Sequence, residues 1–142
     1  VTCLATVIII SSLRVAVKGL FRNRLPPDAI AIEMHEPHGY NLPARHVLHT
    51  VGPIVSGTLT EEHRELLASC YRSCLYLAAE HGLKSVAFCC ISTGEFHFPN
   101  AAAAEIAVRE VRSFLAHDST IERVIFNVFK DEDRVLYEGL LQ

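Results

Sequence analysis

The chain has 142 residues and a mass of 15.8 kDa, which is the size of one domain. Half of its residues are hydrophobic and 20% are charged, so it can bury a core, and a disordered chain is excluded. The formal net charge of −3 argues against nucleic acid as a partner, because nucleic acid requires a basic face. A nucleotide-sized ligand bound by backbone groups is compatible with it.

The cysteines and the apolar start of the chain bear on where the protein works. The five cysteines lack the spacing of a disulfide framework, which indicates a reducing cytosol. The opening apolar run at residues 1–13 ends at Arg14 and is too short to span a bilayer. No basic segment precedes this run, as one would in a signal peptide. The sequence therefore predicts a cytoplasmic protein without a membrane partner.

Residues 1–38 give no clear secondary-structure pattern. They pass from an apolar stretch through a basic stretch to Pro26 and Pro27, so we leave this segment unassigned, as a divergent or misread N-terminal part. The apolar run at residues 1–13 is a candidate strand, although nothing in the sequence decides whether it forms one.

From residue 39 onward, strand and helix signals alternate along the chain. Continuous apolar and β-branched runs indicate strands, while apolar residues spaced three and four apart indicate helices. Thr60 and Asp131 are expected to cap two of the helices. The alternation predicts an α/β fold with three layers, in which helices enclose a mixed, mainly parallel sheet. The predicted strands are 44–51, 85–91 and 121–129, and the predicted helices are 60–82, 100–115 and from 131 onward.

The loop from Ser92 to Pro99 is the most informative part of the sequence. It follows a buried strand and leads into a helix, at the sheet end where α/β folds bind ligands. Gly94 permits close approach of the backbone, and consecutive N–H groups beside a helix N-terminus form a cradle suited to phosphate. The alternative is an ordinary strand-to-helix connection in which Phe96 and Phe98 fill the core.

Three segments of the chain together resemble the macrodomain family. They are YNLPARHVLHTVGPIV at 40–55, VAFCCISTGEFHFPNAAAAEIAV at 86–108 and ERVIFNVFKDEDRVLYEGLL at 122–141. The resemblance covers about residues 39–142 and is to the zinc-containing macrodomains of microbes, which act as protein-ADP-ribose hydrolases. It implies the C-terminal part of a macrodomain fold, incomplete at the N-terminus, because residues 1–38 match neither the family's early strand nor its zinc loop.

The resemblance also implies which residues contact ADP-ribose. One loop would wrap the diphosphate and distal ribose, largely through backbone N–H groups, and the end of the last strand would lie beside the adenosine pocket. Adenine would pack against the ring of Phe129, although core packing against the last helix is equally compatible with this residue. The implied ligand-binding residues are Ser92, Thr93, Gly94, Glu95, Phe96, Asn127 and Phe129, and no catalytic residue is assigned.

Zinc is expected from the family, but its ligands are not found in this chain. Cys3, His35 and His38 are the candidate ligands ahead of residue 39, and they lack the family's loop context, so no metal ligand is assigned. Cysteines on predicted apolar faces are interpreted as structural, because burial suppresses thiol reactivity. These are Cys70, Cys74, Cys89 and Cys90.

Two functions of different classes follow from the resemblance. The first is a protein-ADP-ribose hydrolase, which removes ADP-ribose from modified protein side chains and has ADP-ribose or an ADP-ribosylated protein as its partner. The second is a non-catalytic ADP-ribose-binding module, or an inactive remnant, because the zinc loop is missing. A third reading, an unrelated small α/β domain, requires three matched segments to coincide by chance.

Overall fold

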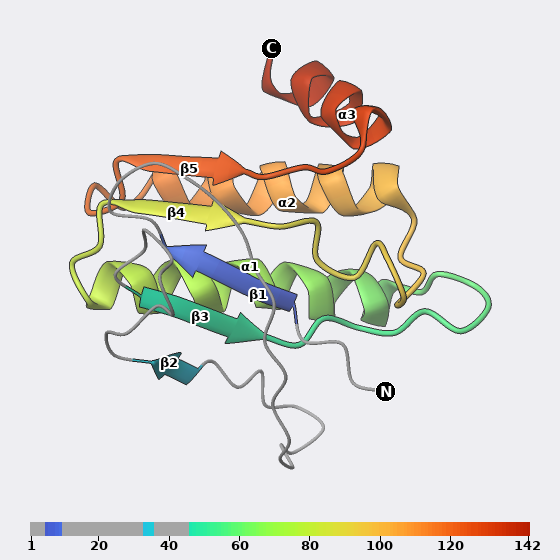
Figure 1. The fold of residues 1–142 in the computed structure, drawn as a ribbon, viewed down its shortest axis with the longest axis horizontal. Helices are drawn as coiled ribbons and strands as arrows, with labels where there is room; N and C mark the ends of the chain where they lie inside the picture. Colours follow the sequence, from blue (N-terminus) through green and yellow to red (C-terminus); the bar gives the residue numbers. More distant parts are fainter. Residues whose placement is uncertain (1–4, 10–32, 36–45) are drawn as a thin grey trace.

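A five-stranded sheet with three helices makes up the described part of the chain. The computed structural model describes residues 5–9, 33–35 and 46–142 (Figure 1). The strands are β1 (Ala5–Ile9), β2 (Glu33–His35), β3 (His46–Thr50), β4 (Ser85–Phe88) and β5 (Arg123–Phe126). The helices are α1 (Glu61–Glu80), α2 (Asn100–Leu115) and α3 (Asp131–Leu141).

The sheet is mixed, as predicted, with the strand order β2-β3-β1-β4-β5, but three of the four pairings among the described strands are antiparallel, whereas the sequence predicted mainly parallel ones. β3, β4 and β5 run in one direction, and β4 pairs with β5 in parallel. β1 and β2 run in the opposite direction, and β1 is antiparallel to both of its neighbours, β3 and β4. The apolar start of the chain therefore supplies a central strand, which decides the question that the sequence left open.

The helices α1 and α2 lie on the same face of the sheet, and α3 lies beyond its β5 edge, next to α2 (Figure 1). This arrangement confirms the α/β class. The described residues place no helix on the second face. No helix in the described ranges is long and apolar enough to cross a membrane.

The core lies between the sheet and the two helices that cover it. Apolar residues recur at spacings of three and four on α1 and α2, so each helix presents one continuous apolar face. A series of aromatic rings crosses this core: Tyr71 lies 4.9 Å from Phe88, Phe88 lies 6.4 Å from Phe126, and Phe126 lies 4.8 Å from Tyr137, measured between ring centroids. These rings connect α1, β4, β5 and α3.

Local signals explain the helix boundaries. The Thr60 hydroxyl accepts a hydrogen bond from the His63 N–H at 3.3 Å, and His63 Nδ1 accepts one from the Thr60 N–H at 3.1 Å, which confirms the predicted cap of α1. The prediction that Asp131 caps α3 is wrong. Lys130 occupies the capping position without a side-chain hydrogen bond, and Asp131 is the first helical residue, where its negative charge still favours the helix N-terminus.

Candidate functional site

Two loops meet at the carboxyl end of the sheet, where β3 and β4 both end. The backbone N–H of Val55, in the loop after β3, donates to the Phe96 carbonyl at 2.9 Å. Gly52 lies against Ser92 so closely that a Cβ atom at Gly52 would collide with the Ser92 hydroxyl. Gly52 lies within the segment that carries the family resemblance, but no sequence pattern assigned it to the site.

The loop after β4 is closed by its own hydrogen bonds. The Phe98 N–H donates to the Ser92 carbonyl at 2.9 Å, the His97 N–H donates to the Gly94 carbonyl at 3.0 Å, and the Thr93 hydroxyl donates to the Cys90 carbonyl at 3.2 Å. Phe96 and Phe98 are buried in the core and anchor the loop from below. The core-filling alternative therefore holds for the Phe96 and Phe98 side chains, which leaves the Phe96 backbone N–H as the group available to a ligand.

This loop also holds two strained residues and a set of unpaired donors. Ser92 and His97 have positive φ angles of 64° and 56°, which are unfavourable for residues with a Cβ atom. In the described part of the chain, no acceptor bonds the backbone N–H groups of Ser92, Gly94, Glu95 and Phe96, and the buried Ser92 hydroxyl also has no partner. Strained residues and buried unpaired polar groups such as the Ser92 hydroxyl concentrate at functional sites.

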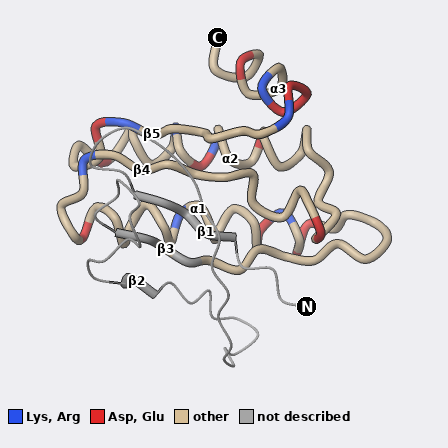
Figure 2. Tube along the Cα trace, viewed as in Figure 1, with Lys and Arg blue, Asp and Glu red and all other residues tan. Residues whose placement is uncertain are grey.

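The electrostatics of this end favour an anion. α2 begins immediately after the loop, its capping residue Pro99 provides no side-chain hydrogen bond, and its first turn contains no acidic residue. No acidic side chain of α2 itself therefore offsets the N–H groups of that turn, and the Asp133 carboxylate of α3, which accepts a hydrogen bond from the Asn100 side chain, lies beside the helix start. Figure 2 shows little charge on the two loops, and between residues 51–60 and 89–99 the only charged side chain is Glu95. Backbone groups, not cationic side chains, would bind the anion.

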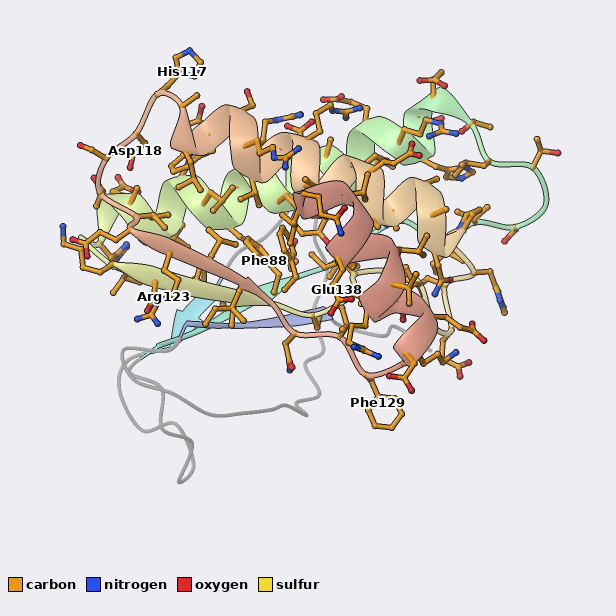
Figure 3. The ribbon with its side chains drawn as sticks, turned by 90° about the horizontal axis from the view of Figure 1, so that it is seen from above. Phe88, His117, Asp118, Arg123, Phe129 and Glu138 are labelled. Atoms are coloured by element: carbon orange, nitrogen blue, oxygen red, sulfur yellow. The ribbon has the colours of Figure 1, made fainter. Side chains whose placement is uncertain are left out.

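The end of β5 forms the neighbouring part of the site. The backbone N–H of Asn127 donates to the Phe88 carbonyl at 2.7 Å and extends the pairing of β5 with β4, while its side chain is exposed. The Phe129 side chain is 99% exposed and projects away from the body of the molecule (Figure 3). Core packing of Phe129 against α3 is therefore wrong, and the ring is free to stack on a ligand.

The cysteines near the site are not nucleophiles. Burial raises the pKa of Cys89 to about 11, and burial together with the charge of Asp133 raises the pKa of Cys90 to about 12. Both thiols remain protonated at neutral pH. Cys70 and Cys74 are buried on α1, as their positions on its apolar face predicted, and all four of these cysteines are free.

The predicted zinc has no site within the ranges that the structure describes. No group of three or more His, Cys, Asp or Glu side chains there is placed to bind a metal ion. Of the earlier candidates, Cys3 and His38 lie outside the described residues, and His35 is described only as part of the β2 backbone.

Comparison with known proteins identifies the family. A model of the Macro domain family matches residues 31–107, and this chain belongs to that family. The chain is 55% identical over 102 residues to the protein-ADP-ribose hydrolase of Treponema medium, covering 72% of this chain and 39% of that protein. It is 48% identical over 101 residues to the ADP-ribose glycohydrolase MACROD2 of Homo sapiens, covering 70% of this chain and 24% of that protein.

Solved structures with this fold include ligand complexes. The Trypanosoma brucei macrodomain in complex with ADP-ribose matches with a TM-score of 0.69 and 38% identity, covering 78% of this chain and 45% of that one. The Oceanobacillus iheyensis macrodomain with ADP matches with a TM-score of 0.71 and 35% identity, covering 78% and 56%. The chain thus spans only part of the length of each of these relatives.

Proposed function

We propose that this chain binds ADP-ribose at the carboxyl end of its sheet, as part of a protein that hydrolyses the bond between ADP-ribose and a modified protein side chain. The observation that carries the proposal is the array of unpaired N–H groups between Ser92 and Phe96, beside the uncapped N-terminus of α2. The names of the relatives support the same ligand and reaction class.

Different residues at this end of the sheet bind different parts of ADP-ribose. The diphosphate accepts hydrogen bonds from the 92–96 backbone, where donors already fixed in position avoid the cost of ordering flexible cationic side chains. Adenine stacks on the exposed ring of Phe129, a contact typically worth about 1 to 3 kcal/mol. The exposed Glu95 contacts the ligand and is assigned no proton transfer.

Calorimetric titration of the chain with ADP-ribose tests the binding proposal. We expect saturable binding of ADP-ribose and of ADP, and much weaker binding of ribose 5-phosphate, which lacks the adenine and the second phosphate. A Gly94→Val variant should fold normally, because open space surrounds Gly94, but its side chain would obstruct the cradle. No binding of ADP-ribose to the folded wild-type chain would contradict the proposal.

A second function, a non-catalytic ADP-ribose-binding module or an inactive remnant, is favoured by one observation. The described residues provide a binding surface but neither a reactive thiol nor a metal-binding cluster. The two functions separate in an assay that follows release of ADP-ribose from an ADP-ribosylated protein. Release above the uncatalysed rate supports the hydrolase, and binding without release supports the module.

Zinc and the cytoplasmic location are parts of the proposal that rest on the family resemblance and on the sequence. Because the described residues do not fit a zinc site, no step of the reaction is assigned to a metal. Elemental analysis of the purified chain measures the zinc content: a catalytic zinc-type member should contain about one zinc ion per chain, while a binding module need not. Free thiols at all four described cysteines are compatible with a reducing cytoplasm.

A further inference from the structure

One side-chain hydrogen bond joins the first turns of α2 and α3. Asn100 Nδ2 donates to Asp133 Oδ1 at 2.5 Å. Asp133 is only 6% exposed, and within the described residues no other side chain donates to it. Because a buried carboxylate is costly unless it is hydrogen-bonded, this contact is the one that permits Asp133 to lie in the interior.

The two partners follow the two halves of the proposed ligand site along the chain. Asn100 is the first residue of α2 and follows the 92–99 loop without a spacer, while Asp133 lies one turn of helix after Phe129 and Lys130. Asp133 is also close to the start of the loop, because its charge, after burial itself, contributes to the raised pKa of Cys90. The contact therefore spans from the diphosphate loop to the segment that carries the aromatic ring.

Few residues of α3 are fully buried, and its half-buried Leu136 and Leu140 also pack against the core. Asp133 and Tyr137, one turn apart, are its only buried residues, and Val135 and Leu141 remain 63% and 50% exposed. Tyr137 packs its ring on Phe126 and holds the helix to β5. The Asn100–Asp133 bond adds the directional contact that sets the start of α3, and hence the position of Phe129, relative to the loop.

We propose that Asn100 and Asp133 are positioning residues that hold the Phe129 ring at the distance from the 92–96 N–H groups that one ADP-ribose molecule requires. This inference rests on the proposed function. A ligand with two ends gains from binding at both only when their spacing fits, since the second contact is then made at a high effective concentration. Loss of the contact should therefore weaken the binding of ADP-ribose and leave the binding of its separate halves, adenosine and pyrophosphate, nearly unchanged.

The Asn100→Ala variant tests this inference. Alanine is the best helix former, so α2 should remain intact. We expect ADP-ribose to bind about tenfold more weakly in calorimetry, while adenosine and inorganic pyrophosphate, measured separately by ligand-observed NMR, change by less than about twofold. The conservative Asp133→Asn variant keeps an oxygen acceptor for Asn100, so its affinity for ADP-ribose should stay within about threefold of wild type.

A matched control removes a carboxylate hydrogen bond at the other end of α2. Asp118 accepts from the Thr120 N–H at 2.8 Å, and Asp118→Ala should lower the unfolding temperature without changing the affinity for ADP-ribose. Unchanged ADP-ribose binding by Asn100→Ala, or an equal loss for adenosine and pyrophosphate, would overturn the positioning role alone. Failure of the folded wild-type chain to bind ADP-ribose would overturn the proposed function, and the positioning role with it.

Discussion

The two ends of the sheet differ in whether the backbone N–H groups of their loops have hydrogen-bond acceptors. At the amino end of β4, the chain leaves α1 through Gly82, whose positive φ of 67° costs a glycine little. There the Gly82 N–H donates to the Ala79 carbonyl at 2.9 Å and the Leu83 N–H donates to the Ala78 carbonyl at 3.0 Å. Both of these donors have an acceptor, and the residue with the positive φ angle is a glycine, which is suited to it.

The turn before β5 is satisfied in the same way. The Asp118 carboxylate accepts from the Thr120 N–H, and the Lys84 carbonyl accepts from the N–H groups of Glu122 at 2.8 Å and Arg123 at 3.1 Å. Figure 3 shows Asp118 and Arg123 at this end of the molecule, and Phe129 at the other. The hydrogen bonds of these two turns therefore stabilise the fold.

The carboxyl end of β4 has the reverse properties. Ser92 and His97 adopt positive φ angles although both carry a Cβ atom, and the N–H groups near them lack acceptors within the described residues. The same chain satisfies such groups at its other end, so the difference is not a general weakness of the fold. Within the described residues, both non-glycine residues with a positive φ lie at this end, and such strain is typical of ligand sites.

The largest predicted effect comes from filling the contact between the two loops. A Gly52→Val variant would place its Cβ within 2.7 Å of Ile91 Cγ2 and against the Ser92 hydroxyl. We expect a loss of about 3 kcal/mol in the free energy of unfolding, measured with urea, and no binding of ADP-ribose. Gly57→Val is the control for the substitution itself. Gly57 has open space around it but a φ of 93°, so this variant should lose less free energy of unfolding than Gly52→Val and should still bind ADP-ribose. Equal stability of Gly52→Val and wild type would show that the loops do not touch.

The next effect separates binding from folding. Phe129→Ala should leave the free energy of unfolding within about 0.5 kcal/mol of wild type, because the side chain is 99% exposed. It should weaken ADP-ribose binding by about 2 kcal/mol in calorimetry, the typical value of a base stacked on a ring. Phe126→Ala is the matched control. The Phe126 ring packs between Phe88 and Tyr137, so its loss should lower the free energy of unfolding, which Phe129→Ala should not. Normal affinity of Phe129→Ala would remove this ring from the site.

These contrasts show which features the sequence could predict. The bounds of α2 agree with the prediction, because its apolar periodicity is a local pattern that tertiary contacts reinforce. The predicted strands at 85–91 and 121–129 were too long: β4 ends at Phe88 and β5 at Phe126. The apolar pattern continues past both ends, but the chain turns there into the site loops, and no local signal marks the left-handed angle of Ser92.

Long-range contacts account for the remaining differences. The antiparallel insertion of β1 between β3 and β4 depends on pairing across the chain, and a short apolar run specifies neither its direction nor its neighbours. The exposure of Phe129 likewise depends on the course of the chain between β5 and α3. A sequence pattern predicts that an aromatic ring ends a strand, but not to which side it projects.

The pH dependence of stability reports on the half-buried Cys89 thiol, which lies just before the ligand loop. Burial raises the pKa of Cys89 from 9.0 to about 11, so the folded state keeps a proton that the unfolded state releases above pH 9. The free energy of unfolding should therefore fall between pH 9 and pH 11, by about 1.4 kcal/mol per pH unit for each such group. Cys89→Ala should show a shallower fall over this range in urea titrations. Parallel curves for the two proteins would contradict the assignment.

The smallest predicted effect tests whether the strain at Ser92 serves binding. Ser92→Gly removes the Cβ from a left-handed residue and a hydroxyl that is buried without a partner, and the greater entropy of unfolded glycine offsets part of the gain. We expect the free energy of unfolding to rise by about 1 kcal/mol, while the affinity for ADP-ribose falls because the donors are less firmly fixed. At the amino end, Gly82→Ala should lower stability by a similar amount without changing affinity. A Ser92→Gly variant that is less stable than wild type, or that binds ADP-ribose as tightly, would show that the strained conformation is a by-product of the fold.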